Sequence, residues 1–392
     1  MLLSKRILRP FLVLVLVLSS SLANAEIVSV LRKSTAEAPT TIASTSTSTS
    51  TSTSTSTSTT PQGIKWHPGH YLLVYDTTTD SSMPGIFHEL DPGFRGVQRR
   101  YSWKNIEPSM GQYNFTSIKN DLTTATAYGK RLVIAIMSET FNKPGVSLVP
   151  SYLLTTQYEG GVYATNTGTN AAYYNTGVQD RMIALYQALG KEFDSNPNLE
   201  AVTMPETSPS IANPTWTSTY LSKYVAGMTR IAVATKTAFP HTVVIQYINY
   251  PTTTLPDMVS SLKSAGIGVG GPDVLVEDTG LINGSYPYIK GLANQVPLGI
   301  AAQYGNYSAR TSGGAYWPPG VNNLNLFARD QLRANYIFWL RRNAESATAA
   351  NGYHASNYYQ EVRDHLAPMN WASDPAGGLN TTCPAMFTSC VK

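Results

Sequence analysis

The sequence predicts a single α/β domain built as a (β/α)8 TIM barrel over residues 64–392. Two observations favour this fold. Eight short apolar runs, each of strand length, recur between longer amphipathic segments of helical period. They are spread over about 330 residues, which is within the size range of single barrels of this kind. A doubly wound open sheet is the alternative.

The expected strands are short runs rich in aliphatic and aromatic residues. They cover residues 71–75, 94–101, 131–137, 200–204, 242–248, 297–303 and 336–340, and the sixth strand is either 273–277 or the preceding glycine-rich 266–270. Two segments between them have a clear helical period. Residues 219–239 form one predicted helix. Residues 178–194 form the other, with an apolar face of Met182, Leu185, Tyr186, Leu189 and Phe193.

The first 63 residues are expected to lie outside the barrel. Basic residues precede an apolar run, and Ala23–Ala25 supplies small residues for a signal peptidase, so residues 1–25 are expected to be a cleaved secretory leader. A retained membrane anchor is the weaker alternative. Residues 26–63 contain an almost strict Ser/Thr alternation, which has no apolar face to bury and predicts a disordered or O-glycosylated linker. The expected location is extracellular or periplasmic.

Composition argues against a polyanionic partner. Removing the leader takes three positive charges from a formal net charge of +4, which leaves the mature chain near +1. Charged residues make up 13% of the chain, whereas Tyr (24) and Gly (29) are abundant, a balance suited to neutral polar ligands. No nucleic acid, membrane or cofactor is therefore expected as a partner. Cys383 and Cys390 lie close together and predict a disulfide that pins the C-terminal tail.

In a barrel of this kind, the C-terminal ends of the strands build the active site, and the opposite end is structural. His67 and His70 precede the first strand, so we expect packing or turn residues there rather than metal ligands. No HExxH, GxSxG or clustered Cys/His motif occurs, which argues against metal-dependent and serine-hydrolase chemistry. Residues 266–271, GIGVGG, match the dinucleotide pattern only formally, because they follow a helix-like segment and open no helix.

Residues 101–115, YSWKNIEPSMGQYNF, carry the most specific motif. A strand-end Arg and aromatic residue followed by W-x-x-x-E-P-x-x-G-x-Y-x-F resembles the second βα unit of the clan A retaining glycoside hydrolases, particularly the β-galactosidase-like and cellulase-like members. In that clan the segment is architectural, so the resemblance implies that Glu107 is a structural ion-pair acceptor for Arg99 or Arg100. The matching residues are Trp103, Glu107, Pro108, Gly111, Tyr113 and Phe115.

The resemblance also implies where catalytic carboxylates belong. The clan's acid/base Glu ends strand four, usually after Asn, and Glu206 matches that place although Pro205 occupies the Asn position. A carboxyl that protonates a leaving oxygen belongs in a partly apolar mouth, where burial raises its pKa. A helix cap or turn acceptor is the other interpretation of Glu206. The clan's nucleophile ends strand seven, where this sequence has Gln303, so either the strand count is off by one or the mechanism differs.

Other carboxylates at predicted strand ends are candidates for the second catalytic group. Inverting hydrolysis needs two carboxyl groups roughly 6.5 to 9.5 Å apart, with a water molecule between them. Asp273 and Asp278 are the preferred bases, and the alternative for Asp273 is a turn-capping role. The full set is Glu139 after strand three, Asp273, Glu277 and Asp278 around strand six, and Asp76 after strand one.

Aromatic and polar residues near the same strand ends are predicted to bind sugar rings, whose apolar faces pack on aromatic surfaces. Core or loop packing is the alternative for each aromatic residue taken singly. Residues 149–175, a long stretch rich in Gly, Tyr and Asn, are expected to form a wall of the active site. The substrate-binding candidates are Arg100, Trp103, Tyr247, Asn249, Tyr250, Gln303, Tyr304, Tyr316, Trp317 and Trp339.

These observations favour a secreted glycoside hydrolase with Glu206 as general acid and an Asp near strand six as base. A carbohydrate-binding barrel without catalysis is the second hypothesis, because Gln303 stands where a nucleophile is expected. A polysaccharide lyase is the third, although the nearly neutral chain offers uronic acids no evident basic cleft.

Overall fold

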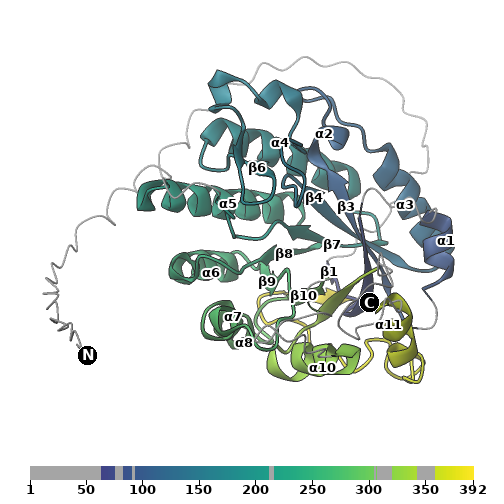
Figure 1. The fold of residues 1–392 in the computed structure, drawn as a ribbon. Helices are drawn as coiled ribbons and strands as arrows, with labels where there is room; N and C mark the ends of the chain where they lie inside the picture. Colours follow the sequence, from purple (N-terminus) through teal and green to yellow (C-terminus); the bar gives the residue numbers. More distant parts are fainter. Residues whose placement is uncertain are drawn as a thin grey trace, which may run out of the picture. The chain divides into compact units, whose positions relative to one another are not determined.

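Eight parallel strands close into the predicted barrel (Figure 1). The computed structural model describes residues 63–75, 83–90, 93–211, 216–303, 306, 320–341 and 358–392, all of one structural unit. Closure excludes the open doubly wound sheet. The strands, in their order around the barrel, are β2 (Gly69–Val74), β3 (Gly96–Ser102), β4 (Arg131–Met137), β7 (Leu199–Met204), β8 (Val243–Tyr247), β9 (Gly268–Gly271), β10 (Leu298–Ala302) and β11 (Tyr336–Leu340).

The sixth strand is the glycine-rich alternative, β9, and the segment 273–277 after it is irregular. Glycine is needed there because a Cβ atom on Gly270 would lie 1.6 Å from the carbonyl oxygen of Gly299 on β10. Any larger residue would push these two paired strands apart. The other seven strands overlap the predicted runs, so the predicted number and order of strands are confirmed.

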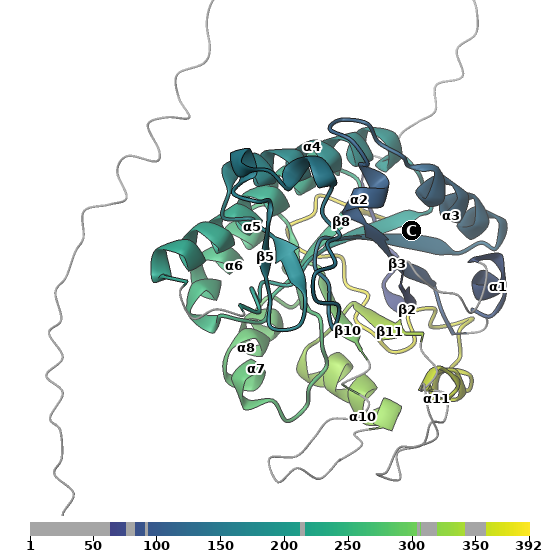
Figure 2. The same ribbon diagram turned by 45° about the horizontal axis from the view of Figure 1, so that its top comes forward.

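Helices cover the outside of the barrel (Figure 2). The two helices predicted from their period are present as α4 (Thr176–Phe193) and α5 (Ser218–Ala238). Asn175 and Thr217 cap them, since each side chain accepts a hydrogen bond from a first-turn N–H. None of the described helices is both long and apolar enough to cross a membrane. The others described are α1 (Met83–His88), α2 (Trp103–Ile106), α3 (Thr116–Ala127), α6 (Leu255–Ser264), α7 (Thr279–Asn283), α8 (Ser285–Gly291), α10 (Gly320–Leu326) and α11 (Tyr358–Leu366).

Alternate residues of each strand face opposite sides, so the domain has two apolar layers. On β2, Tyr71 and Leu73 pack inside the barrel, whereas Leu72 and Val74 pack between the sheet and the helices. Aromatic rings such as Phe338 fill the interior. The barrel is therefore a packed core rather than a channel, and its rim at the C-terminal strand ends is left to hold a substrate.

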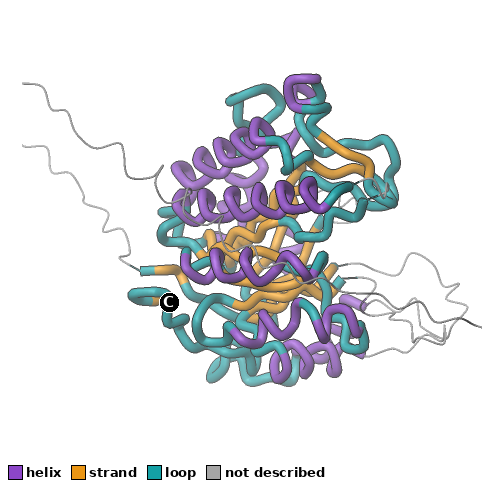
Figure 3. Tube along the Cα trace, turned by 90° about the vertical axis from the view of Figure 1, so that its left-hand side faces the viewer, coloured by secondary structure: helices purple, strands orange, loops and turns teal. Residues whose placement is uncertain are grey.

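The N-terminal end of the barrel carries a short two-stranded sheet (Figure 3). β1 (Ile64–Lys65) pairs in parallel with β12 (Cys390–Val391). The Cys383–Cys390 disulfide ties the tail beside this pair, so the predicted disulfide is present. Trp66 packs edge-on against Tyr336 of β11 above it, with ring centroids 5.5 Å apart.

The two histidines near this end are packing residues, as predicted. The backbone N–H of His67 donates to Oε1 of the buried Glu200 at 2.6 Å, and its Nδ1 lies 2.8 Å from Oε2. His70 accepts a hydrogen bond at Nδ1 from the indole of Trp339. Burial lowers the pKa of His70 to about 4. Over the described residues, no group of three or more His, Cys, Asp or Glu side chains is arranged to hold a metal ion.

Candidate active site

Polar side chains gather in a cavity at the C-terminal rim of the barrel. Glu139 and Glu206 each follow a strand end by two residues, after β4 and β7, and Gln303 directly follows β10. The cavity measures about 460 Å³, the open space at its mouth included. The structure therefore brings together residues far apart in the sequence. The lining residues are Gln98, Arg100, Ala135, Ile136, Met137, Glu139, Phe141, Thr203, Met204, Pro205, Glu206, Tyr247, Pro272 and Gln303.

Glu206 is held in this cavity as a carboxyl that keeps its proton unusually well. Burial raises its pKa to about 7, and the charge of Asp273 adds to the increase. A hydrogen bond from Nδ2 of Asn249 to Oε2 of Glu206 and the charge of Arg100 act in the opposite direction. Glu206 does not cap the next helix, because Thr217 caps α5. The helix-cap alternative for Glu206 is therefore excluded at α5.

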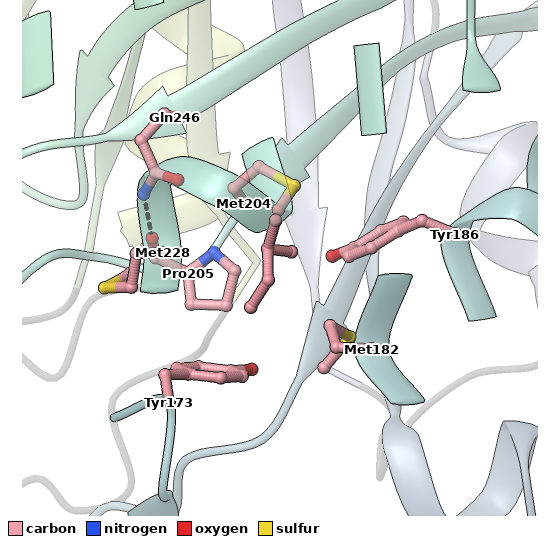
Figure 4. Close-up of a pocket in the computed structure, with 8 residues that line it drawn as sticks. Tyr173, Met182, Tyr186, Met204, Pro205, Met228 and Gln246 are labelled. Carbon is pink, nitrogen blue, oxygen red and sulfur yellow. Dashed lines mark hydrogen bonds between the residues drawn. The ribbon is translucent and has the colours of Figure 1, made fainter. Parts of the chain in front are cut away.

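The backbone just before Glu206 is held by a side chain of the neighbouring strand β8 (Figure 4). Nε2 of Gln246 on β8 donates to the carbonyl oxygen of Pro205. Behind this bond, Met182 on α4 and Met228 on α5 line a small apolar cavity together with Pro205. Packing and one hydrogen bond therefore set the direction in which the Glu206 side chain leaves the barrel wall.

Asp273 lies beside the cavity, two residues after β9. Burial raises its pKa, while a hydrogen bond of 2.8 Å from Nδ2 of Asn306 to Oδ1 and the charge of Arg100 favour the ionised form. The same Asn306 accepts hydrogen bonds at Oδ1 from the backbone N–H groups of Val274 and Gln303. One amide side chain thus joins the ends of strands six and seven.

Gln303 follows the seventh strand, so the strand count from the sequence is right. Its Nε2 donates to the carbonyl oxygen of Pro272 at 2.9 Å. Its Oε1 accepts from the Tyr75 hydroxyl and from the Arg100 guanidinium, each at 3.2 Å. The guanidinium lies over the Tyr75 ring, 4.8 Å from its centroid. An ordered amide therefore occupies the position of the clan's nucleophile.

Glu139 is a third carboxyl in the same cavity. It is 3% exposed, and its Oε1 has no hydrogen-bond partner. Burial raises its pKa to about 9, with a further increase from Glu206 and a decrease from Arg100. Near neutral pH it is therefore a neutral acid that presents a donor to the cavity.

Glu139→Gln is expected to stabilise the protein above about pH 5. Folding raises the pKa of Glu139 from an ordinary value of 4.5 to about 9, so the folded state holds a proton that the unfolded state has released. The free energy of unfolding of the wild type therefore falls as the pH rises through this range. The amide removes this loss, on the order of 2 kcal/mol at pH 7. Urea unfolding at about pH 4 and pH 8 measures the difference, and a variant no more stable than wild type at the higher pH would contradict it.

Several predicted site residues lie elsewhere. Trp103 and Trp339 are fully buried outside the barrel, where their indoles donate to Glu107 and to His70, so the prediction that they bind substrate is wrong.

Asp278 caps α7 by accepting from the N–H of Leu281 at 2.8 Å. Its Oδ1 also accepts from the hydroxyl of Tyr250. Neither Asp278, Tyr250 nor the exposed Glu277 lines the cavity. Asp76, Tyr304, Tyr316 and Trp317 lie outside the described residues.

Glu107 has the structural role that the resemblance implied, but with another partner. It is fully buried and forms an ion pair with Arg181 on α4. It also accepts from the indole of Trp103 at 3.0 Å and from the N–H of Gly111 at 2.9 Å. Arg99 instead pairs with Asp121 on α3. The expected partners, Arg99 and Arg100, were therefore wrong, because the pairing depends on how α4 packs.

Sequence analysis missed three contributors to the site. Phe141 lines the cavity with 43% of its surface exposed, two residues after Glu139. Gln98 donates from Nε2 to Thr203 and to the hydroxyl of Tyr247 on the barrel interior, both at 2.8 Å. Asn306 binds Asp273, and its position three residues after Gln303 was the only available signal. The alternation of strand residues predicts that Gln98 faces inward, but it does not predict these partners.

The barrel is similar to those of solved glycoside hydrolases. The catalytic domain of β-amylase from Paenibacillus polymyxa has a TM-score of 0.53 at 11% identity, covering 78% of this chain and 100% of that chain. β-Galactosidase from Marinomonas ef1 has a TM-score of 0.53 at 9% identity, covering 76% and 59%. β-Galactosidase from Bacillus circulans sp. alkalophilus has a TM-score of 0.52 at 9% identity, covering 77% and 56%. This chain thus spans little more than half the length of the two β-galactosidases.

These neighbours have a TIM barrel like that of this chain, so the predicted fold class is confirmed. No family model and no curated protein sequence matches the chain. At this identity the likeness describes the fold alone, and the chemistry has to be argued from the residues of the rim cavity.

Proposed function

We propose that this protein is a secreted glycoside hydrolase that cleaves glycosidic bonds in a polysaccharide or oligosaccharide. Glu206 is the general acid and Asp273 is the general base. One observation carries the proposal: burial and the charge of the nearby Asp273 together raise the pKa of Glu206 to about 7. Two neighbouring carboxyls in different protonation states are the requirement for acid/base hydrolysis of a glycoside.

The reaction would proceed in a single displacement. Glu206 donates its proton to the glycosidic oxygen as the bond from that oxygen to the anomeric carbon breaks. Asp273 takes a proton from a water molecule whose oxygen bonds to the same carbon from the opposite face. Hydrolysis therefore needs no group beyond the two carboxyls and water. Phe141 and Tyr247 contribute aromatic surface to the cavity in which the sugar ring would lie.

The strand positions of the two carboxyls favour inversion. Neighbouring strands lie about 4.8 Å apart, so the ends of β7 and β9, which are separated by β8, are roughly 10 Å apart. A carboxyl pair carried on these two strands can leave room for the water molecule that an inverting enzyme needs. The alternative nucleophile position holds Gln303, whose amide cannot form a glycosyl-enzyme intermediate. The separation of the two strands and the amide of Gln303 both argue against a retaining mechanism.

The charge of the cavity is close to balanced. Near neutral pH Glu139 is protonated and Glu206, with a pKa of about 7, is about half protonated, so few negative charges face the Arg100 guanidinium. Arg100 is the one basic side chain among the described lining residues, so the cavity is no basic cleft for uronic acids, and neutral sugars are the proposed substrates. The binding-only hypothesis retains one supporting observation, the amide of Gln303 at the nucleophile position.

Secretion is part of the proposal. The basic and apolar leader, the Ser/Thr tract and the Cys383–Cys390 disulfide support it, since disulfides persist in oxidising compartments. An N-terminal sequence of the protein recovered from the culture medium or periplasm is expected to begin at Glu26. Recovery of the uncleaved chain in the membrane fraction would favour the anchor instead.

The anomeric configuration of the first product tests the mechanism. The enzyme is incubated with neutral polysaccharides and oligosaccharides, and the product is followed by proton NMR before mutarotation. We expect the configuration opposite to that of the cleaved bond. Retention would require a covalent intermediate and would contradict the assignment of Asp273 as base. Tight binding without turnover across the whole panel would favour the binding-only barrel.

A further inference from the structure

We propose that an aromatic surface beside the Glu206 cavity binds an extended glycan chain and guides it into that cavity. The surface consists of Tyr174, Trp216 and Tyr220 and is called the aromatic platform below. The inference deepens the proposed function, since it makes the substrate a polymer long enough to contact both regions.

The rings of the platform contact one another on the surface. Tyr174 packs edge-on against Trp216 and against Tyr220, with ring centroids 5.4 Å and 5.1 Å apart. Trp216 and Tyr220 are tilted at 41° with centroids 6.1 Å apart. Tyr220 is 40% exposed, and Tyr174 and Trp216 are partly buried. Three neighbouring rings therefore share one continuous surface that solvent reaches.

Two further aromatic residues, the partly buried Tyr163 and the buried Tyr224, pack against the platform. Tyr163 lies under Trp216, with centroids 4.7 Å apart, and Tyr224 on α5 lies 5.6 Å from Trp216. The hydroxyl of Tyr224 accepts a hydrogen bond from Asn170 at 3.2 Å. The inner rings thus have packing and polar partners that account for their positions.

The platform is on the catalytic side of the barrel. Tyr174 comes from the segment after β4, and Trp216 and Tyr220 come from the segment after β7, so the two strands that bring Glu139 and Glu206 to the cavity also lead to the platform. The hairpin of β5 (Val162–Ala164) and β6 (Thr169–Ala171) lies beside α5 (Figure 2) and at the end of the molecule opposite the β1–β12 pair (Figure 3).

Direct contacts connect the platform to the loop that carries Glu206. The hydroxyl of Tyr163 donates to the carbonyl oxygen of Pro209 at 2.8 Å, only three residues after Glu206. Thr165 and Ile211 form an isolated antiparallel bridge between the hairpin and the same loop. Three residues span at most about 10 Å, so the hairpin on which the platform packs contacts the chain close to the Glu206 carboxyl.

The chemistry of the platform fits a glycan. Tyr and Trp present apolar faces on which pyranose rings stack, and their hydroxyl and indole N–H groups reach sugar oxygens at the ring edge. Residues 149–175, expected from the sequence to form an active-site wall, contribute Tyr174 to this surface. That expectation is thereby sharpened: the segment would extend the substrate groove beyond the cavity.

Binding without turnover tests the platform directly. Trp216→Ala with Tyr220→Ala is placed in the Glu206→Gln background, and mobility is followed by affinity electrophoresis through gels that contain soluble starch, mixed-linkage β-glucan, galactan or galactomannan. We expect at least one polymer to retard the Glu206→Gln protein, and the two added substitutions to weaken that retardation about tenfold or more. Unchanged retardation, or none with any polymer, would overturn the proposal.

Tyr128→Ala is the matched control. Tyr128 is 41% exposed but lies at the C-terminal end of α3, just before β4, and hence at the opposite end of the barrel. It should leave retardation unchanged, and an equal loss with this variant would overturn the proposal. Tyr220→Ala alone tests whether a loss of binding comes from misfolding, because Tyr220 lies in the exposed first turn of α5, where truncation should leave the fold intact. It should weaken binding while the melting temperature stays within a few degrees of the parent.

The outcomes separate the platform from the proposed function. Hydrolysis by wild type without dependence on the platform residues would overturn the platform and leave the hydrolase assignment standing. Retardation that depends on the platform, without hydrolysis of any polymer, would support the platform and overturn the hydrolase assignment. A concentration-dependent dimer that the double substitution abolishes would identify a self-association surface instead and overturn the glycan proposal.

Discussion

Glu206→Gln is expected to lower kcat by about 10²- to 10⁴-fold on whichever glycan the wild type cleaves, the usual contribution of a general acid. The amide has the shape of the carboxyl but cannot donate a proton to a leaving oxygen. Stability should be unchanged or higher, because a partly buried carboxyl with a raised pKa is removed. Release of reducing ends measures the rate, and urea unfolding measures the stability.

Glu277→Gln is the matched control for this change. Glu277 was a catalytic candidate from its place near strand six, but it is exposed and does not line the cavity. The variant should keep the wild-type rate. A full rate in the Glu206 variant, or an equal loss in both variants, would refute the assignment of Glu206.

The pH profile gives a second measure of Glu206. A general acid works only while protonated, and the pKa of Glu206 is about 7 in the folded protein. The value of kcat/KM should therefore fall as the pH rises through about 7, and fall again at acid pH as Asp273 gains a proton. A rate that stays constant up to about pH 9 would show that another group donates the proton.

Glu107→Gln should have the opposite pattern, a large loss of stability with little loss of kcat. The substitution leaves the partly buried Arg181 guanidinium without its ion-pair partner and weakens the bonds from Trp103 and Gly111. Breaking a buried pair from one side costs about 3 kcal/mol. Because Glu107 lies outside the cavity, the fraction that stays folded should turn over at nearly the wild-type rate. Thermal and urea unfolding give the first quantity, and rates corrected for folded protein give the second.

The Lys119–Glu192 pair is the control for Glu107. Its side chains are 56% and 43% exposed, so Glu192→Gln should change the stability by less than about 1 kcal/mol. Comparable losses for the two variants would mean that burial is not what makes the Glu107 pair important. A collapse of kcat in Glu107→Gln, with the fold intact, would place Glu107 in the chemistry after all.

The positions of strand-end residues were well predicted. Apolar runs of strand length and two helical periods are local features of the chain, and they were enough to give eight strands in the right order. The count also placed Glu206 and Gln303 correctly at the ends of strands four and seven. Two segments were possible for the sixth strand, and the glycines were a local signal for the correct one, because the close approach of β10 leaves no room for a side chain at Gly270.

The contacts that individual side chains make were predicted poorly. Trp103 and Trp339 were expected at the substrate because of their type and their distance from strand ends, yet both pack in the layer between sheet and helices. Trp339 alternates on β11 with the inward-facing Phe338 and therefore faces the helices, and Trp103 lies on α2. Glu107 was correctly expected to form an ion pair, but its partner Arg181 comes from α4, more than seventy residues away in the sequence.

The sequence by itself determined the barrel, its strand order and the carboxylates available at its rim, because periodic burial and strand length are set by neighbouring residues. Only the tertiary structure decided which of these carboxylates share a cavity and how their pKa values differ. The pKa values of Glu139, Glu206 and Asp273 are raised because the folded barrel takes each carboxyl partly or fully out of water and places Glu206 near both Glu139 and Asp273. Burial and charge interactions depend on distance in space, and the distance between strand ends is fixed only when the sheet closes.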